Sequence, residues 1–321
     1  MVRSVLIYVG LDLIGDGLMK LPFVRAVRHA FPEARITWCA GRGKTVYGAS
    51  LAPVVAGLID EVIEDIGLGD DWRQLFGRRP LGGRHFDVIL DTQRRVLPSL
   101  ILRRVHHGLF ISAAAGWLLS DRGPRNRRKL PGMVAQMMKL LEAACGRPIS
   151  ADAPITIPFA MVEQAEQLLP DGPAYVGLSP GAGGRHKCWP LKDYIALAEM
   201  LMRQGQAPVF LLGPAEAEWA DEIKAALPGV SVPLGLNPLE TIAVGRRLAV
   251  AVANDSGIGH MLAAADVPMV SLFGPTSAEK FAPAVARLTV VKSQDFGGDD
   301  MVLIPKEAVL TAVNSFLSLQ F

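Results

Sequence analysis

Several short polar motifs in this sequence carry residues that could bind an anion or move a proton. The first is Ile14-Gly15-Asp16-Gly17, which follows a short apolar run. A carboxylate there can accept a proton from a hydroxyl group, but Asp is also common at the start of a helix, where it caps backbone amides. Both interpretations of Asp16 stay open. The motif is not a dinucleotide fingerprint, because Lys20 stands where G-x-G-x-x-G needs its last glycine.

A second motif is rich in glycine and is followed by basic side chains. It runs Ser179-Pro180-Gly181-Ala182-Gly183-Gly184 and continues with Arg185, His186 and Lys187. Glycines let backbone amides approach an oxyanion closely, and a lysine adds a point charge. The segment is therefore either a phosphate-binding loop or a flexible loop with solvated cations. It is not a Walker loop, because no Lys-Ser or Lys-Thr pair follows Gly184.

Two further motifs follow predicted strands near the C-terminal end. Asn254-Asp255-Ser256-Gly257, with His260 shortly after, has the small polar residues of a helix start. The amides of Ser256 and Gly257 could bind an anion there, or Asp255 or Ser256 could cap the helix with His260 packed inside. Both can hold at once. Phe273-Gly274-Pro275-Thr276 is either a capping turn or another phosphate-facing turn.

Alternating strands and helices must position these motifs. Short apolar runs predict buried strands, and longer runs with helical spacing predict the helices between them. The predicted strands are Val5–Val9, Ala34–Cys39, Glu61–Ile66, Phe86–Leu90, Tyr175–Leu178, Val209–Leu212, Leu248–Ala253 and Met269–Phe273. The predicted helices are Leu18–Ala30, Pro98–Val105, Met133–Ala144, Leu191–Arg203, Glu216–Leu227, Gly259–Ala265 and Lys306–Leu317. This order predicts two parallel α/β sheets, whose ligands bind beyond the strand ends in a shared cleft.

Composition narrows the classes of partner. The chain has 321 residues, half of them hydrophobic, which predicts two domains with sizeable cores. The 33 basic and 31 acidic residues leave no global signal for nucleic acid. Its 3 scattered cysteines exclude a disulfide framework and a cysteine zinc site, and they predict a cytoplasmic location. The longest apolar stretch, over 108–119, is shorter than the ~20 residues of a membrane-spanning helix.

One basic segment, Arg122–Lys129, stands out locally. It follows the apolar stretch over 109–119. Such a segment is either a solvated face or a contact for an anionic lipid or phosphosugar.

Taken together, the motifs resemble glycosyltransferase family 9, the lipopolysaccharide heptosyltransferases. The resemblance covers residues 5–277 and is most specific where NDSGIGH is followed by FGPT. The other segments that carry it are LIYVGLDLIGDGLMKLP, DTQ, SPGAGGRHKCWP and LLGPAEAE. It implies a GT-B fold with an acceptor-binding domain over 1–158, a donor-binding domain over 159–303, and a helix over 304–321 that packs back on the first domain.

The resemblance also implies an activity. It indicates inverting transfer of a heptose or related sugar, without a metal or cofactor, from a nucleotide-sugar donor such as ADP-heptose. The acceptor would be a lipopolysaccharide core or another lipid-linked or phosphorylated glycan. The protein would act in the cytoplasm, where it could also contact the inner membrane peripherally. It would bind no nucleic acid. A GT-B nucleotide-sugar epimerase and a catalytically degenerate nucleotide-sugar-binding protein are the alternatives.

Roles for single residues follow from the same resemblance. Asp16 matches the general base, Lys187 the lysine on the donor diphosphate, and Glu216 a ribose contact. Other donor contacts are expected at Ser179, Gly181, Asp255, Ser256, Gly257 and His260, and acceptor contacts at Gly15, Gln93, Arg94 and Arg122. One position departs from the pattern: many members carry Lys or Arg where this chain has Gly10. Arg185 is the candidate to replace that charge.

Overall fold

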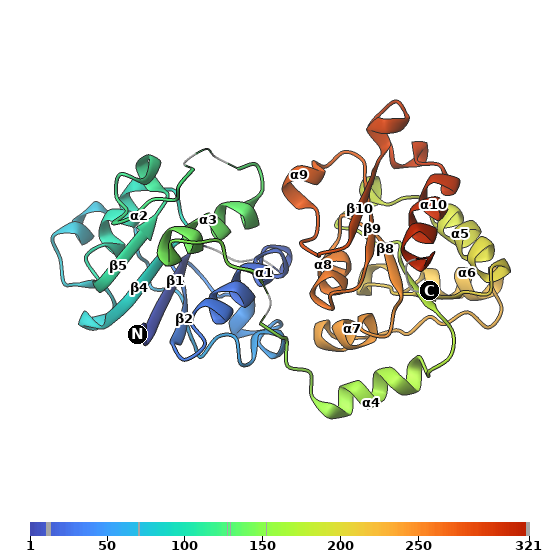
Figure 1. Ribbon diagram of the computed structural model, residues 1–321, viewed down its shortest axis with the longest axis horizontal. Coiled ribbons are helices and arrows are strands. Elements are labelled where there is room, and N and C mark those ends of the chain that lie inside the picture. The colour runs from blue at the N-terminus through green and yellow to red at the C-terminus, as the bar shows by residue number, and fades with distance from the viewer. Residues whose placement is uncertain (11–13, 70, 127, 129, 152, 319–321) are drawn as a thin grey trace. The chain divides into compact units, whose positions relative to one another are not determined.

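Each half of the chain forms its own five-stranded parallel sheet. The computed structural model describes residues 1–10, 14–69, 71–126, 128, 130–151 and 153–318. Its contacts divide the chain into two units, Met1–Thr156 and Ile157–Phe321, which Figure 1 shows in blue to green and in green to red. The predicted α/β class with two parallel sheets is confirmed.

The first unit has the strand order β3-β2-β1-β4-β5. Its elements are β1 Ser4–Val9, α1 Ile14–Ala30, β2 Arg35–Ala40, β3 Glu61–Ile63, β4 His85–Asp91, α2 Val96–Leu102, β5 His106–Ser112 and α3 Met133–Cys145. Helices α1 and α3 pack against each other. Helix α2 contributes Ile101 and Leu102 to a buried cluster with Leu6, Ile89 and Phe110. The order in which successive strands are added to the sheet reverses between β1 and β4. Ligands are therefore expected beyond the carboxyl ends of those two strands.

The second unit has the strand order β10-β9-β8-β6-β7. Its elements are α4 Phe159–Leu168, β6 Tyr175–Ser179, α5 Leu191–Arg203, β7 Ala207–Phe210, α6 Trp219–Ala226, α7 Pro238–Gly245, β8 Val250–Asn254, α8 Gly257–Ala264, β9 Met269–Phe273, α9 Ala278–Phe281, β10 Leu288–Lys292 and α10 Lys306–Leu317. Here the order in which strands are added reverses between β6 and β8. The glycine-rich motif after β6 and the Asn-Asp-Ser motif after β8 therefore both lie at a topological switch point.

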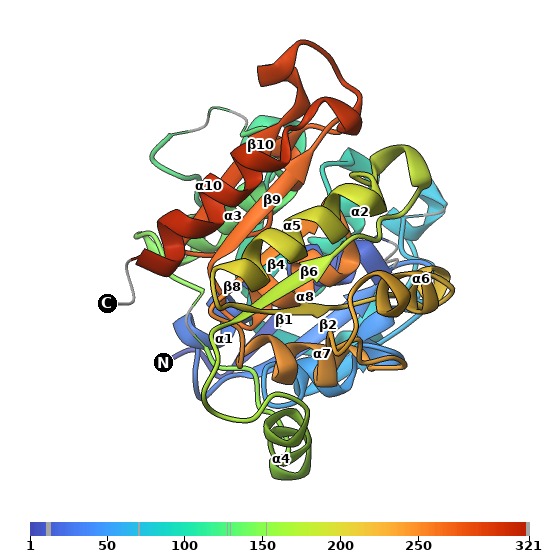
Figure 2. The ribbon, with the colours of Figure 1, turned by 90° about the vertical axis from the view of Figure 1, so that its right-hand side faces the viewer.

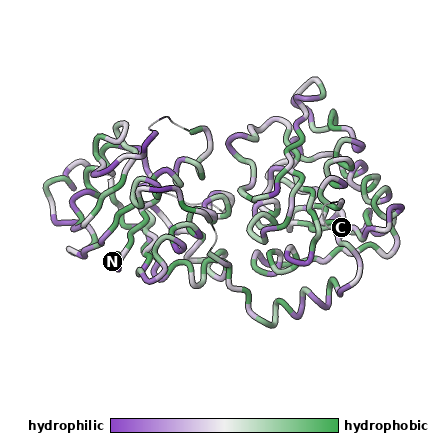
Figure 3. The backbone as a smooth tube through the Cα atoms, in the orientation of Figure 1, coloured by the Kyte–Doolittle hydropathy of each residue, from purple (hydrophilic) through white to green (hydrophobic). Residues whose placement is uncertain are grey.

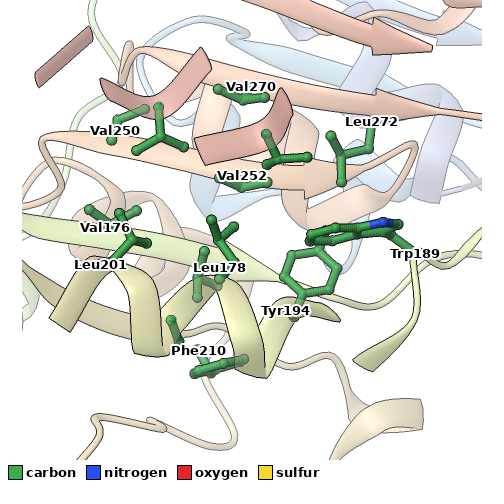
Figure 4. Packing of buried hydrophobic residues seen from close by; sticks show 14 of the residues in the cluster. Val176, Leu178, Trp189, Tyr194, Leu201, Phe210, Val250, Val252, Val270 and Leu272 are labelled. Atoms are coloured by element: carbon green, nitrogen blue, oxygen red, sulfur yellow. The ribbon is translucent and has the colours of Figure 1, made fainter. Parts of the chain in front are cut away.

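Burial on both faces explains the strands of the second sheet. Every residue of β8 and β9 is buried, and Figure 3 colours these strands mostly as hydrophobic. One face packs against α5, α6 and α10, and the other against α4, α7 and α8. Figure 4 shows the first of these cores, where Trp189 and Tyr194 lie next to each other. Their ring centroids are 4.9 Å apart in an edge-to-face contact.

The C-terminal helix corrects one prediction. The expectation that it packs back on the first domain is wrong, because α10 lies beside α5 in the second unit (Figure 2). Its apolar side buries Val309, Val313, Phe316 and Leu317 in the core of that unit. Helix α10 packs against β8 and β9. This packing removes the apolar surface of these side chains from water. Residues 319–321 of the predicted segment lie outside the described residues.

Candidate active site

The buried side chain of Asn254 joins the two loops at the switch point of the second sheet. Its Nδ2 donates to the carbonyl oxygens of Pro180 at 2.8 Å and Gly181 at 3.4 Å. Its Oδ1 accepts from the amide of Trp189 and the hydroxyl of Tyr194, both at 3.2 Å. Asn254 is fully buried, so all four bonds form away from water. The glycine-rich loop after β6 is therefore held against the end of β8.

Lys187 and the first turn of α8 form the cationic part of this site. The Nζ of Lys187 lies 3.4 Å from Oδ2 of Asp255, and both side chains are partly exposed. Ser256 is the N-cap of α8, and its Oγ accepts from the amide of Gly259 at 3.1 Å. The amides of Gly257 and Ile258 precede the first intrahelical bond, so they point outward from the positive end of the helix. A lysine and two helix amides together can bind a phosphate group.

Glu216 packs closely against two glycines of neighbouring loops. A Cβ on Gly181 would lie 2.6 Å from Cδ of Glu216, and a Cβ on Gly213 would lie 2.6 Å from its Oε2. Glycine at both positions thus leaves room for this carboxylate. Glu216 ends the short 3-10 turn Pro214–Glu216 after β7. The structure therefore brings two predicted donor residues, Gly181 and Glu216, together from different loops.

Other predicted donor residues have different placements. The side chain of Ser179 is fully buried and cannot touch a ligand in this conformation, although its carbonyl accepts from the Tyr194 hydroxyl at 3.1 Å. Burial lowers the pKa of His260, although nearby Asp255 opposes the shift. The buried environment of His260 thus favours its neutral form. Arg185 pairs with Glu218 at 2.6 Å and lies over the ring of Trp219, so it is engaged locally.

The structure corrects the capping interpretation of the FGPT turn. Ser277, not Thr276, is the N-cap of the short helix α9, and its side chain makes no capping hydrogen bond there. Gly274 packs tightly, since a Cβ there would lie 2.6 Å from Sδ of Met301. This close approach explains the glycine without a ligand.

A separate cavity lies at the switch point of the first sheet. It has a volume of about 210 Å³ and opens beyond the ends of β1, β4 and β5. Its lining consists of Asp16, Lys20, Thr92, Gln93, Arg94, Ala113, Met133, Gln136, Met137 and Leu140. The cavity brings three predicted residues together, Asp16, Gln93 and Arg94. A carboxylate, a guanidinium and an amide beside an apolar wall from α3 suit a polar, charged sugar.

The structure also decides the position of Asp16 in its helix. Helix α1 begins at Ile14, so Asp16 lies in the first turn and is not the N-cap. A carboxylate there is stabilised by the positive end of the helix. Gly15 is exposed, and Arg122 is exposed and outside the cavity lining. Arg127 and Lys129 of the predicted basic segment lie outside the described residues.

Gly10 has a structural consequence at this cavity. A Cβ on Gly10 would lie 2.9 Å from Oε1 of Gln93. The glycine therefore leaves space for the Gln93 amide to lie against the backbone. The Nη1 of Arg94 donates to Oε1 of Gln136 at 2.7 Å, which ties the loop after β4 to α3.

A buried carboxylate beneath this loop was not predicted from the sequence. Asp91 is fully buried at the end of β4. Its Oδ1 accepts from the amide of Gln93 at 2.9 Å, and its Oδ2 accepts from the hydroxyls of Ser99 and Ser112. Burial raises the pKa of Asp91 to about 6, although these three donors partly oppose the rise. Asp91 thus holds the backbone of the Gln93–Arg94 loop.

The part of the chain that the structure describes contains neither a cluster of metal-binding side chains nor a helix that could span a membrane. Within it, no three His, Cys, Asp or Glu side chains are grouped as a metal ion would need. None of the helices there is both long enough and apolar enough to cross a membrane.

Comparison with known proteins places this geometry in a family. The model of "Glycosyltransferase family 9 (heptosyltransferase)" matches residues 75–301. A lipooligosaccharide heptosyltransferase 2 of Haemophilus influenzae is 33% identical, over 89% of this chain and 88% of the relative. A lipopolysaccharide heptosyltransferase 1 of Pseudomonas aeruginosa is 36% identical, over 88% and 82%.

Solved structures agree on the fold. An E. coli heptosyltransferase with bound ADP-2-deoxy-2-fluoro heptose superposes with a TM-score of 0.66 and 20% identity, over 98% of this chain and 99% of the other. This likeness supports the GT-B fold, with two Rossmann-like units. The family model covers well over half of the sequence, and the two relatives extend the match to most of it. The chain belongs to glycosyltransferase family 9.

Proposed function

We propose that this glycosyltransferase moves a heptose, or a closely related sugar, from ADP-heptose to a lipopolysaccharide core or a similar envelope glycan. The second unit would bind the donor and the first unit the acceptor. The observation that carries the proposal is the Lys187–Asp255 pair beside the first turn of α8. This cationic site lies at a switch point, where parallel sheets bind nucleotides.

The donor chemistry fits these groups. As the sugar leaves, negative charge develops on the oxygen that joins it to the diphosphate. Lys187 and the amides of Gly257 and Ile258 would stabilise that charge in advance. Asp255 would hold the lysine in place, because a carboxylate cannot itself bind a phosphate. Glu216 would accept hydrogen bonds from the ribose hydroxyls. These residues supply positive charge at the leaving group without a metal ion.

The acceptor chemistry assigns a different task to the first unit. An acceptor hydroxyl would attack the anomeric carbon from the face opposite the departing diphosphate, so the sugar would be transferred with inversion. The carboxylate of Asp16 would take the hydroxyl proton as the new bond forms. A carboxylate is too weak a base to ionise an alcohol beforehand, so general-base help acts only as the new bond forms in the transition state. Gln93 and Arg94 would orient the acceptor in the cavity that Asp16 lines.

The relatives do not identify the acceptor, since their names include both heptosyltransferase 1 and heptosyltransferase 2. A lipid-linked acceptor would place the reaction on the cytoplasmic face of the inner membrane. We therefore include peripheral membrane contact in the proposal, together with a cytoplasmic location and the absence of a cofactor.

The proposal is tested by incubating the protein with ADP-heptose and truncated lipid A core acceptors and measuring released ADP. Transfer predicts ADP release that depends on the acceptor, together with a gain of one heptose in the acceptor mass. An epimerase would change the donor sugar without an acceptor. A degenerate binding protein would bind ADP-heptose without releasing ADP from it. Either of these results would overturn the assignment, and a parallel panel of other nucleotide sugars identifies the donor.

A further inference from the structure

A segment between β3 and β4 of the first unit exposes two large aromatic rings. Trp72 is 60% exposed and Phe76 is 79% exposed. Their ring centroids lie 6.2 Å apart in an edge-to-face arrangement. Exposed aromatic pairs of this size are unfavourable in water, because their apolar surface remains hydrated. Such a pair marks a candidate contact for a partner that would cover it.

The surrounding contacts hold these rings at the surface. Trp72 begins a 3-10 turn over Trp72–Leu75, which Asp71 caps by accepting from the amide of Arg73 at 2.9 Å. The Arg104 guanidinium donates to the carbonyls of Gln74 and Gly77. Leu75 packs against the core cluster of this unit. The segment is thus anchored from within while both rings face outward.

Gln74 adds a second anchor. Its Oε1 accepts from the amide of Gly69 at 2.7 Å, and its Nε2 donates to the carbonyl of Gly67 at 2.6 Å. Both side-chain groups of this residue are therefore used to hold the segment. The exposure of the neighbouring rings follows from a fixed backbone conformation.

Positive charge surrounds the same two rings. Residues 70–84 contain four arginines and two aspartates, Asp70 and Asp71, of which Asp71 caps the turn. Arg84 pairs with Glu61 at 2.7 Å, but Arg73, Arg78 and Arg79 are exposed. Arg79 also lines a hollow of about 350 Å³ with Arg103, Arg104, His106 and His107. A second hollow, of about 410 Å³, is lined by Gln74, Gly77 and Arg78 of the segment and by the apolar side chains of Ile66, Leu68, Leu81 and Ile101.

Arginines and exposed aromatics in one patch match the chemistry of a membrane interface. Tryptophan favours the depth of the lipid headgroups, where its ring is partly apolar and partly polar. Arginine binds phosphate oxygens and is attracted to anionic lipid. A purely anionic glycan would use the arginines but would leave both rings in water. A bilayer covers both kinds of group at once.

We propose that Trp72, Phe76, Arg73, Arg78 and Arg79 form a docking surface for an anionic phospholipid bilayer. The rings enter the boundary between headgroups and acyl chains, and the guanidinium groups bind lipid phosphates. The purpose of this docking rests on the proposed function, since a lipid-linked acceptor is presented at such a bilayer. The binding itself needs neither donor nor acceptor, so it can be measured alone.

The tryptophans of this chain give a direct readout. Of its 5 tryptophans, Trp38, Trp117, Trp189 and Trp219 are at most 9% exposed, so Trp72 alone reports on the solvent. We expect its fluorescence to shift to shorter wavelength with vesicles of phosphatidylglycerol and phosphatidylethanolamine, and not with phosphatidylcholine alone. Trp72→Phe should remove the shift while the protein still floats with the anionic vesicles. No shift, or an equal shift with both vesicle types, overturns the proposal.

Charge variants test the second half of the surface. Replacing Arg73, Arg78 and Arg79 together by Gln should weaken anionic vesicle binding roughly 100-fold, at about fivefold for each arginine near the surface. Trp72→Ser with Phe76→Ser should also lower binding, at unchanged melting temperature. The matched controls lie in the second unit: Phe159→Ser, at a site 74% exposed, and Arg203→Gln, with a side chain 69% exposed, should have no effect.

The two proposals fail separately. Wild-type binding by the triple arginine variant would contradict the docking surface. All of these variants should release ADP from a soluble, truncated acceptor at the wild-type rate, because none of the changed residues lines the Asp16 cavity. Acceptor-dependent ADP release without vesicle binding overturns only the docking surface. Vesicle binding without any transfer overturns only the proposed function.

Discussion

Lys187 shows how one side chain can carry much of a binding site. Its Nζ lies 3.4 Å from Asp255, next to the first turn of α8. We expect Lys187→Ala to weaken ADP-heptose binding at least about tenfold, because a charge-assisted hydrogen bond contributes roughly 1.5–3 kcal/mol. Lys187→Arg should lose less, since it keeps the charge. Isothermal titration calorimetry with ADP-heptose measures the difference, and unchanged affinity in Lys187→Ala would remove the residue from the donor site.

Asp91 predicts an unusual pH dependence of stability. Burial raises its pKa in the folded state to about 6 from an ordinary value of 3.8. The folded protein therefore holds the proton more tightly than the unfolded chain does, and this residue lowers stability as the pH rises from 4 to 6. Asp91→Asn removes that loss. Relative to wild type, the variant should gain about 3 kcal/mol in the free energy of unfolding between pH 4 and pH 7.

Urea unfolding at several pH values measures this gain, and Asp87 provides a control of opposite sign. Hydrogen bonds from the backbone amides of Arg3 and Ser4 lower the pKa of Asp87 below its usual value, so its ionised form stabilises the fold. Asp87→Asn should therefore lose stability relative to wild type as the pH rises through the carboxylate range. A pH-independent difference for Asp91→Asn would show that the buried carboxylate does not titrate as stated.

At the scale of elements, Asn254 links the end of β8 to the glycine-rich loop. Asn254→Ala leaves its buried partners without hydrogen bonds. Each unsatisfied group costs roughly 1–3 kcal/mol of stability. We expect a loss of several kcal/mol in unfolding free energy, together with weaker ADP binding because the loop is released. The control Asn237→Ala removes the N-cap of α7 and should cost about 1 kcal/mol with no change in ADP affinity. Unchanged ADP affinity in Asn254→Ala would limit this residue to folding.

Strands buried on both faces were predictable, but two of the four edge strands were not. The predicted ranges of β1 and β9 agree closely with the structure, because fully buried parallel strands are continuously apolar. The edge strands β5 and β10 were missed. Most residues of each strand are only partly buried or are exposed, so neither strand is a continuous apolar run. The short helices α4 and α7 were also missed, and the predicted helix over 216–227 is divided between a 3-10 turn and α6.

The candidate site was predictable in its motifs and not in its contacts. Lys187 meets Asp255 because β6 and β8 are neighbours in the sheet, and strand order is not written in either motif. Asn254 was part of a recognised motif, but its bonds to the backbone of Pro180 and Gly181 depend on that same pairing. Asp91 followed a strand in the segment DTQ, yet its burial by Ser99 and Ser112 required the structure.

At the scale of the whole molecule, each unit has its own buried core. Val313 of α10 is fully buried with the second unit's core, and Val27 of α1 is fully buried in the first unit. Val313→Ala should cost about 2 kcal/mol through lost burial and a small cavity. Hydrogen exchange should then rise in β6, β8 and β9 and stay unchanged in β1 and β4. Val27→Ala should give the reverse pattern, and a rise in both units for either variant would contradict separate cores.

The most direct test of the central claim is the turnover of Asp16→Asn with ADP-heptose and a lipid A core acceptor. Because Asp16 is not the N-cap of α1, Asn should cost at most about 1 kcal/mol through the weaker helix-end interaction. Melting temperature and ADP affinity should therefore stay close to wild type, while acceptor-dependent ADP release falls by roughly 10²–10⁴, the usual contribution of a general base. Near-normal turnover with an intact fold would contradict the assignment of Asp16 as the base.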